Sequence, residues 1–328
     1  MNQDSDSNNA PTSSNAATPT DVAILIVTYN SEEEIEECLT SVFEQRDKIT
    51  QEVIVLDNLS QDNTVTLIKA KFPQVKLIQP GENLGFAKGV NEAARHANSK
   101  YILLLNPDTQ IVKNAIDRIF NFAESKKGHG LYGGRTIQPD GSLEASSCWG
   151  LPTLWSHAMF AFGLSTIFKK NPVFDPESLG NWKRDTVKEV GVITGCFLLC
   201  LKSFWDDTLQ GFDERYFMYG EDVDLAMRTH ANGCTPIICP EAELIHEVGK
   251  SSKTPTHKMI LLFKGKACLA ITHWRGAKKS LALLFLKFGV LLRSLPSIIK
   301  GNKTPERWHY LWTQRREWIK GYPTSSEN

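Results

Sequence analysis

Short apolar runs alternate with helical hydrophobic patterns through the first third of the chain. The runs are rich in Val, Ile and Leu, which suits strands that are buried on both faces. Strands that alternate with helices predict a parallel sheet joined by right-handed crossovers. The expected strands cover residues 22–27, 52–56, 75–78 and 101–105, and the expected helices cover residues 31–43, 60–71 and 85–97. Ser31 and Glu34 have capping-box spacing, so we expect the first helix to begin at Ser31.

The pattern changes in the second half of the chain. Pro139-Asp140-Gly141 predicts a turn between two short strands. Residues 148–188 contain aromatic residues, Pro and Gly without clear periodicity, which indicates a mobile or acceptor-facing insertion. Further strands are expected at residues 190–201, 236–239 and 244–246, and a helix at residues 221–231.

Polar turns follow three of the predicted strands, at residues 28–30, 57–58 and 106–108. Ligands of parallel sheets bind beyond the carboxyl ends of the strands, so these turns converge on a candidate site. Asp57 is suited to accept hydrogen bonds from a base or a ribose, but an ordinary Asx turn explains it equally well. Asp108 is suited to a divalent cation that also binds substrate phosphates. Alone, it is better explained as part of a turn that closes the strand.

The segment "NLGFAKGVNEAA" places Gly85 and Gly89 at a strand-to-helix junction. Glycines there let backbone amides approach a phosphate. The spacing is neither G-x-G-x-x-G nor a Walker loop, so close helix packing remains the better explanation of the bare motif.

Three carboxylates, Glu221, Asp222 and Asp224, fall within four positions at the start of a predicted helix. Clustered carboxylates raise one another's proton affinity, which suits a general base. Stabilisation of the helix N-terminus accounts for one or two of them. His246 follows a short apolar run, and alone it is better read as an ordinary histidine than as a metal ligand.

Charge separates the C-terminal part from the rest of the chain. The 328 residues have a formal net charge of zero, but residues 258–328 hold 14 Lys/Arg against 3 Asp/Glu. With the apolar stretch 280–299 and the aromatic residues Trp308, Trp312 and Trp318, this favours an interfacial helix on an anionic membrane. A helical bundle that packs on the body is the alternative.

The remaining composition narrows the class of protein. The seven cysteines show no zinc-knuckle spacing and suit a core in a reducing compartment. The first 20 residues lack an apolar h-region, so we expect a disordered tail and no signal peptide. The sequence contains no run of about 18 or more uncharged apolar residues, so it predicts no membrane-spanning helix.

Five motifs occur in the order found in one enzyme family: "VTYN", "LDN", "NLGFAKGVNEA", "LLLNPDT" and "GFDERYFMYGEDVDLAMR". Together they resemble the family 2 inverting glycosyltransferases with a GT-A fold, and most closely the bacterial rhamnosyltransferase branch. The resemblance covers residues 21–252. It implies an α/β fold with a Rossmann-like, mostly parallel central sheet flanked by helices. We add a basic amphipathic C-terminal extension, which gives a tail at 1–20, a GT-A domain at 21–257 and the extension at 258–328.

The resemblance also implies roles for individual residues. Asp222 would be the catalytic base, and Asp108 and His246 would hold Mg²⁺ or Mn²⁺. Asn106 replaces the first Asp of the family's metal motif, and Lys88 stands where a small residue is common. The nucleotide sugar would contact Thr28, Tyr29, Asn30, Asp57, Asn83, Gly85, Lys88 and Asn106, and the acceptor side would include Gly195, Cys196 and Glu221.

The implied reaction transfers a sugar with inversion, and L-rhamnose from dTDP-rhamnose is the first expectation. The acceptor would be a glycan or a polyprenyl-diphosphate-linked sugar in cell-surface polysaccharide synthesis, at the inner face of the plasma membrane. A galactofuranosyl or other hexosyl transfer from a UDP-sugar, a nucleotidyltransferase and a non-catalytic nucleotide-sugar-binding protein are the alternatives. We expect no nucleic-acid partner, and the sequence leaves the oligomeric state open.

Overall fold

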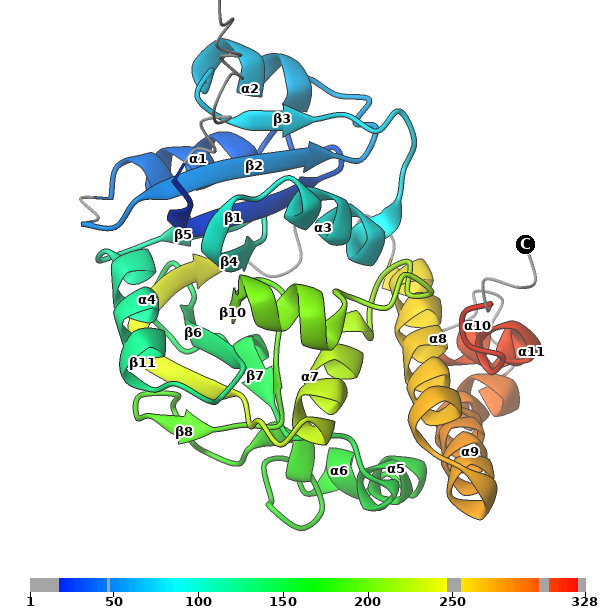
Figure 1. Ribbon diagram of the computed structural model, residues 1–328. Helices are drawn as coiled ribbons and strands as arrows, with labels where there is room; N and C mark the ends of the chain where they lie inside the picture. Colours follow the sequence, from blue (N-terminus) through cyan, green and yellow to red (C-terminus); the bar gives the residue numbers. More distant parts are fainter. Residues whose placement is uncertain (1–17, 46–47, 247–254, 301–306, 324–328) are drawn as a thin grey trace, which may run out of the picture.

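The computed structural model describes residues 18–45, 48–246, 255–300 and 307–323. A nine-stranded sheet forms the centre of this described part, in the order β3-β2-β1-β4-β10-β6-β11-β5 with β8 beside β11 (Figure 1). The strands are β1 Thr20–Thr28, β2 Gln51–Asp57, β3 Lys76–Ile78, β4 Ser99–Leu105, β5 Thr109–Ile111, β6 Leu131–Ile137, β8 Lys188–Glu189, β10 Phe197–Leu201 and β11 Ile237–His246, and β7 (Cys148–Trp149) pairs with β9 (Val192–Ile193) in a separate small sheet.

The four predicted strands of the first third form the parallel half of the sheet. β1 pairs in parallel with both β2 and β4, and β2 pairs in parallel with β3. β10 then runs antiparallel between β4 and β6, a reversal that the sequence pattern did not predict. The expected strands at 236–239 and 244–246 are one strand, β11, whose pairing with β6 is irregular between Ile238 and Glu243.

Helices cover both faces of the sheet, because alternate residues of β1 point to opposite sides. Ala23 and Leu25 share a core with α3 and α7, whereas Ile24 and Ile26 share a core with α1, α2 and α4. The helices of this region are α1 Ile35–Phe43, α2 Thr64–Lys71, α3 Gly85–Arg95, α4 Ala115–Ser125, α5 Leu154–Ala161, α6 Leu164–Ile167 and α7 Glu221–Ala231.

Two predicted helix starts are wrong, because side chains in the turns bind elsewhere. α1 begins at Ile35 without a side-chain cap, and Ser31 Oγ accepts a hydrogen bond from the Tyr29 backbone N–H at 3.4 Å in the preceding turn. α2 begins at Thr64 because Ser60 is bonded to Asp57. The segment 148–188, predicted without periodicity, contains α5 and α6, and Thr153 forms a capping box with Ser156 at the start of α5.

The C-terminal residues form a helical bundle that packs on the body, which was the alternative to the interfacial helix. Its helices are α8 Pro255–His273, α9 Gly276–Lys300, α10 Arg307–Thr313 and α11 Arg315–Trp318 (Figure 1). The expected boundary at residues 257/258 therefore falls within α8. Phe263, Leu286, Leu311 and Trp318 are 5% exposed or less and share a core of their own. The expected tail at residues 1–20 lies mostly outside the described residues.

The bundle joins the body by close backbone packing and polar contacts. Gly265 of α8 lies so close to the loop before α7 that a Cβ there would come within 2.2 Å of the Tyr219 carbonyl oxygen. Near the C-terminus, the Tyr322 hydroxyl donates to the Met218 carbonyl. None of the helices in the described ranges is both long and apolar enough to cross a membrane.

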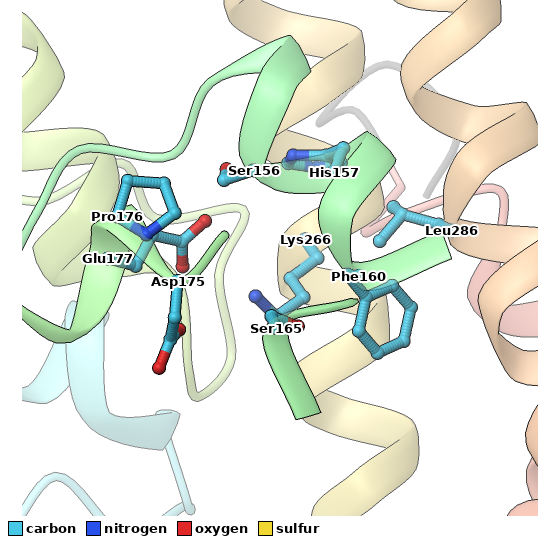
Figure 2. A pocket seen from close by; sticks show the side chains of 9 residues that line it. All are labelled: Ser156, His157, Phe160, Ser165, Asp175, Pro176, Glu177, Lys266 and Leu286. Atoms are coloured by element: carbon cyan, nitrogen blue, oxygen red, sulfur yellow. The ribbon is translucent and has the colours of Figure 1, made fainter. Parts of the chain in front are cut away.

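A small cavity of about 110 Å³ lies where α5 and the loop after α6 meet α8 and α9 (Figure 2). His157 is 5% exposed, and its Nδ1 lies 2.9 Å from the Thr153 carbonyl oxygen. Burial, and then the charge of Lys266, lower the pKa of His157 to about 4, so the ring is neutral. The cavity is lined by Ser156, His157, Phe160, Ser165, Asp175, Pro176, Glu177, Lys266 and Leu286.

Candidate active site

Segments far apart in the sequence meet at one edge of the sheet. Thr28 and Asp57 are paired at the ends of β1 and β2, and Leu105 ends β4 opposite Phe197. The loop before α7 reaches the N-terminus of α3, where the Phe86 backbone N–H donates to the Phe217 carbonyl at 2.8 Å. The polar turns and the acidic start of α7 therefore gather at the carboxyl edge, as predicted for a parallel sheet.

Asp57 is 2% exposed, and protein donors occupy both of its carboxylate oxygens. Oδ1 accepts from the hydroxyls of Thr28 at 3.0 Å and Ser60 at 2.5 Å, and Oδ2 accepts from the Ser60 backbone N–H at 3.0 Å. The Asx-type turn is thus present. Thr28 is fully buried and supports Asp57, while Tyr29 is 53% exposed at the same edge.

Asn30 ties the turn after β1 to the turn after β2. It adopts the left-handed conformation with φ 53°, and its Oδ1 accepts from the Gln61 backbone N–H at 2.7 Å. Its own N–H donates to Ser60 Oγ at 2.9 Å. The first two polar turns are therefore a single preformed unit.

Gly85 is held where only glycine fits. Its φ is +77°, and a Cβ would lie 2.5 Å from the Phe217 carbonyl oxygen. Its N–H donates to Asn83 Oδ1 and its carbonyl accepts from Asn58 Nδ2, each at 2.9 Å. Close packing thus accounts for this glycine, while Lys88, one turn later on α3, is exposed.

Asp108 and His246 are brought together by strand pairing. His246, the last residue of β11, pairs with Thr109, the first residue of β5, and Asp108 directly precedes Thr109. Asp108 Oδ1 lies 3.5 Å from His246 Nε2, and the two side chains are 8% and 11% exposed. Asp108 Oδ1 and His246 Nδ1 are buried without a hydrogen-bond partner. Asp108 Oδ1, which lacks a hydrogen bond, and His246 Nε2, which faces it, fit a divalent cation.

The turn at residues 106–108 is fixed by backbone contacts. The Asn106 N–H donates to the Cys196 carbonyl at 3.2 Å, and the Asn106 carbonyl accepts from Thr109 Oγ1 at 2.6 Å. Cys196 is buried, and burial raises its thiol pKa to about 12. A Cβ on Gly195 would lie 3.1 Å from the Phe86 ring. Gly195 and Cys196 thus connect β10 to the Asn106 turn.

The start of α7 presents two carboxyl groups with different surroundings. Tyr219 at φ 70° and Gly220 at φ 108° turn the chain sharply into the helix. Glu221 is 6% exposed, and burial, then the charge of Asp222, raise its pKa well above the ordinary range. Asp222 is partly exposed, and its Oδ1 accepts from the Val223 N–H at 2.8 Å. Desolvation of its carboxyl group by the surrounding protein raises the pKa of Asp222 to about 6. The charge of Asp222 therefore favours the protonated form of Glu221.

Asp224, the third acid of the cluster, is a structural residue. It is 1% exposed, and its carboxylate lies 2.8 Å from Arg228 Nε and 2.7 Å from His273 Nε2. His273 belongs to α8, so this buried group links α7 to the C-terminal bundle.

Sequence reasoning assigned no role to two supporting residues, although it placed Asn58 in one of the polar turns. Asn91 of α3 donates to the Phe212 carbonyl at 2.9 Å and accepts from the Phe212 N–H at 2.8 Å. Asn58 accepts from the Leu84 N–H at 3.1 Å. An asparagine inside a helix, where its propensity is poor, was the available signal for Asn91. Both residues join motifs that are separate in the sequence.

Comparison with known proteins gives matches to glycosyltransferases. Residues 23–185 match the family described as "Glycosyl transferase family 2". An N-acetylglucosaminyl-diphospho-decaprenol L-rhamnosyltransferase from Mycobacterium tuberculosis is 31% identical over 243 residues, which is 70% of this chain and 76% of that protein.

Solved structures share the fold. The crystal structure of S. aureus TarS 1-349 has a TM-score of 0.53 at 17% identity, over 92% of this chain and 81% of that one. The mannosyltransferase PcManGT from Pyrobaculum calidifontis, in complex with GDP-Man and Mn²⁺, also has a TM-score of 0.53, at 16% identity over 92% of this chain and 86% of that one.

The fold is that of a GT-A glycosyltransferase. By its sequence, the chain belongs to glycosyl transferase family 2. The α/β class with a central sheet flanked by helices and the glycosyltransferase family, both predicted above, are confirmed.

Proposed function

We propose that this protein transfers L-rhamnose from dTDP-rhamnose, with inversion, to a polyprenyl-diphosphate-linked sugar in cell-surface polysaccharide synthesis. The observation that supports this type of reaction is that one edge of the sheet holds both a partly exposed Asp222 and the Asp108–His246 pair. The name of the mycobacterial relative supports the donor sugar and the lipid-linked acceptor. The proposed place of action is the inner face of the plasma membrane.

The residues present fit a divalent cation, Mg²⁺ or Mn²⁺. Asp108 and His246 would hold it, and both have buried polar atoms without hydrogen bonds. In the described ranges, no group of three or more His, Cys, Asp or Glu side chains is arranged to bind a metal, so diphosphate oxygens and water would complete its coordination. Such an ion, when bound, neutralises charge on the leaving diphosphate.

Asp222 is the proposed general base. The acceptor hydroxyl oxygen forms a bond to the anomeric carbon while the bond from that carbon to the diphosphate oxygen breaks. Asp222 takes the hydroxyl proton, and the diphosphate leaves with the bonding electron pair. Attack from the face opposite the leaving group inverts the anomeric centre without a covalent enzyme intermediate. Burial and the charge of Asp222 raise the pKa of Glu221 and favour its protonated form, so Glu221 is assigned to the acceptor side.

The remaining assignments follow the positions of the side chains along the edge. The preformed unit of Tyr29, Asn30 and Asp57 would receive the nucleoside, with Thr28 supporting it from behind. Asn83, Gly85 and Lys88 would lie near the ribose and diphosphate, and Asn106 would face the same donor. Gly195 and Cys196 would form the floor of the acceptor side.

A donor screen tests the proposal. Thermal unfolding of the full chain would be followed with dTDP-rhamnose, UDP-galactofuranose and UDP-glucose, each with and without Mn²⁺. We expect the largest rise in melting temperature with dTDP-rhamnose plus Mn²⁺. Incubation with an N-acetylglucosaminyl-diphospho-polyprenol would then give a product whose anomeric configuration, measured by NMR, is opposite to that of the donor. A larger shift with a UDP-sugar contradicts the donor assignment, and retained configuration contradicts inversion.

A further inference from the structure

Helix α9 carries apolar side chains on two different faces. Ala282, Leu286 and Val290, spaced by four residues, are 2% exposed or less and face the bundle. On another face, Leu281 and Leu284 are 40% and 55% exposed. A helix that is apolar on more than its core-facing stripe is typical of one that meets a second apolar environment.

The end of α5 and the short helix α6 extend the exposed face of α9. The Phe162 ring, which is 54% exposed, lies 6.2 Å from the Phe285 ring and 5.7 Å from the Phe288 ring of α9. Arg293 of α9 donates to Thr166 Oγ1 of α6 at 3.1 Å. We define the α6–α9 surface by its exposed apolar residues, which are Phe162, Ile167, Phe168, Leu281, Leu284 and Leu295.

The charged side chains of these segments have one sign. Residues 145–174 and 248–305 contain no Asp or Glu. The nearest following acid, Asp175, accepts a hydrogen bond from the Lys170 backbone N–H at 2.9 Å. The cationic residues of α9 and of the segment directly after α6 include Lys169, Lys170, Lys278, Lys279, Lys287 and Arg293.

We propose that the α6–α9 surface is the membrane-contact surface of this protein. Its apolar side chains enter the interface of the bilayer, and its lysines meet the phosphates of anionic lipids. The combination of exposed aromatic and aliphatic side chains with cations of one sign favours this occupant over a second copy, which would bring like charges together. The inference rests on the proposed function, because a lipid-linked acceptor is the reason for the enzyme to reach a membrane.

This surface differs from the one that the sequence indicated. Trp318, expected as an anchor, is fully buried, and its Nε1 donates to the Leu311 carbonyl at 2.8 Å. Trp308 and Trp312 pack against the same bundle core. The tryptophans therefore stabilise the bundle. The proposed membrane contact is made instead by the exposed face of α9 and by α6.

The test measures sedimentation of the full chain with vesicles of phosphatidylglycerol and phosphatidylcholine, and with phosphatidylcholine alone. Removal of helices α8 to α11 is a poor test, because Asp224 of α7 binds His273 of α8.

We expect Ile167→Ser with Leu284→Ser to reduce binding to anionic vesicles by about tenfold or more, because apolar contact area is lost. Lys170→Gln with Lys287→Gln should weaken binding severalfold and reduce its dependence on salt.

Val187→Ser is the matched control, because Val187 is 47% exposed, precedes β8 and is not one of the residues that define the α6–α9 surface. It should bind vesicles as the unchanged protein does. The proposal would be overturned if the Ile167/Leu284 variant bound anionic vesicles as well as the unchanged protein does. It would also be overturned if the unchanged protein bound neutral vesicles as well as anionic ones. So would a dimer in solution that this variant dissociates, because that result identifies a second copy as the occupant.

A separate readout distinguishes this inference from the proposed function. The thermal shift with dTDP should be the same in the surface variants as in the unchanged protein, which shows that fold and site are intact. Vesicle binding without sugar transfer would reject the proposed reaction and keep the surface. Sugar transfer to a short-chain acceptor without vesicle binding would reject the surface alone.

Discussion

Two sets of carboxylates at the candidate active site have opposite surroundings. Asp57 and Asp224 are almost fully buried, and hydroxyl, amide, guanidinium or imidazole groups meet their oxygens. Asp108 has a buried oxygen without a hydrogen bond, and so does Glu221. Buried polar atoms are normally satisfied in folded proteins, so the exceptions mark groups that are kept for a ligand or a proton. The comparison separates acids that hold the structure from acids that are available for chemistry.

The largest effect is expected at the proposed base. Asp222→Asn should lower kcat by about 100-fold or more, the scale of a lost general base, and leave the melting temperature nearly unchanged. Single-turnover kinetics and thermal unfolding of the same sample would measure both. Full turnover in this variant would remove Asp222 from the mechanism.

Asp224 should behave in the opposite way. Asp224→Ala leaves Arg228 and His273 without their buried partner and should reduce the free energy of unfolding by about 3–5 kcal/mol. Urea unfolding measures this loss. Glu92→Ala is a control, because its ion pair with Arg95 is more exposed and should contribute less than about 1 kcal/mol. Similar losses in the two variants would show that the buried link is not structural.

Metal binding should depend more strongly on Asp108 than on Asn106, which lies in the same turn. Asp108→Ala should weaken Mn²⁺ binding in the presence of dTDP by about tenfold or more, because a charged ligand is lost. Asn106→Ala should weaken it less, because an amide oxygen is a weaker ligand. Calorimetric titration of both variants provides the measurement, and equal losses would contradict the assignment.

Stability should distinguish Asp57 from Asp108. Asp57→Ala leaves the Thr28 and Ser60 donors without their acceptor and should cost about 1–3 kcal/mol of unfolding free energy. Asp108→Ala removes an oxygen that has no hydrogen bond, so its cost in the absence of metal should be smaller. Chemical denaturation of both variants in EDTA compares them, and the reverse order would contradict the distinction.

The smallest expected effect is the pH dependence of turnover. The base form of Asp222 is the ionised form, and its pKa is about 6, so protonation removes activity as the pH falls. We expect kcat to halve near pH 6 and to fall about tenfold for each further unit. A pH–rate profile in saturating substrates tests this. A flat profile between pH 5 and 7 would contradict the assigned pKa.

Local patterns predicted the parallel half of the sheet and much of the site, for identifiable reasons. The strands at residues 22–27 and 101–105 are apolar on both faces, and helix α7 begins at Glu221 as expected. That Asp108 and His246 share a site was implied by the family resemblance and not by a local pattern, and the pairing of β5 with β11 brings the two residues together.

Long-range contacts account for what the sequence did not predict. The antiparallel β10, the clamp of Asn91 on Phe212 and the link from Asp224 to His273 join positions that no local pattern connects. The burial of Trp318 was missed for a related reason. An aromatic residue among cations has the same local signature whether it faces a bilayer or fills a small bundle core.

The contact of Gly265 with Tyr219 and Gly220 bears on how far this protein is modular. The C-terminal bundle follows the sheet domain in the sequence, yet its first helix contacts the backbone that leads into the acidic start of α7. A chimera that exchanges the bundle for one from another glycosyltransferase must therefore carry the loop before α7 with it. For protein engineering, the segment that is exchanged should therefore begin at this loop and not at the boundary predicted at residues 257/258.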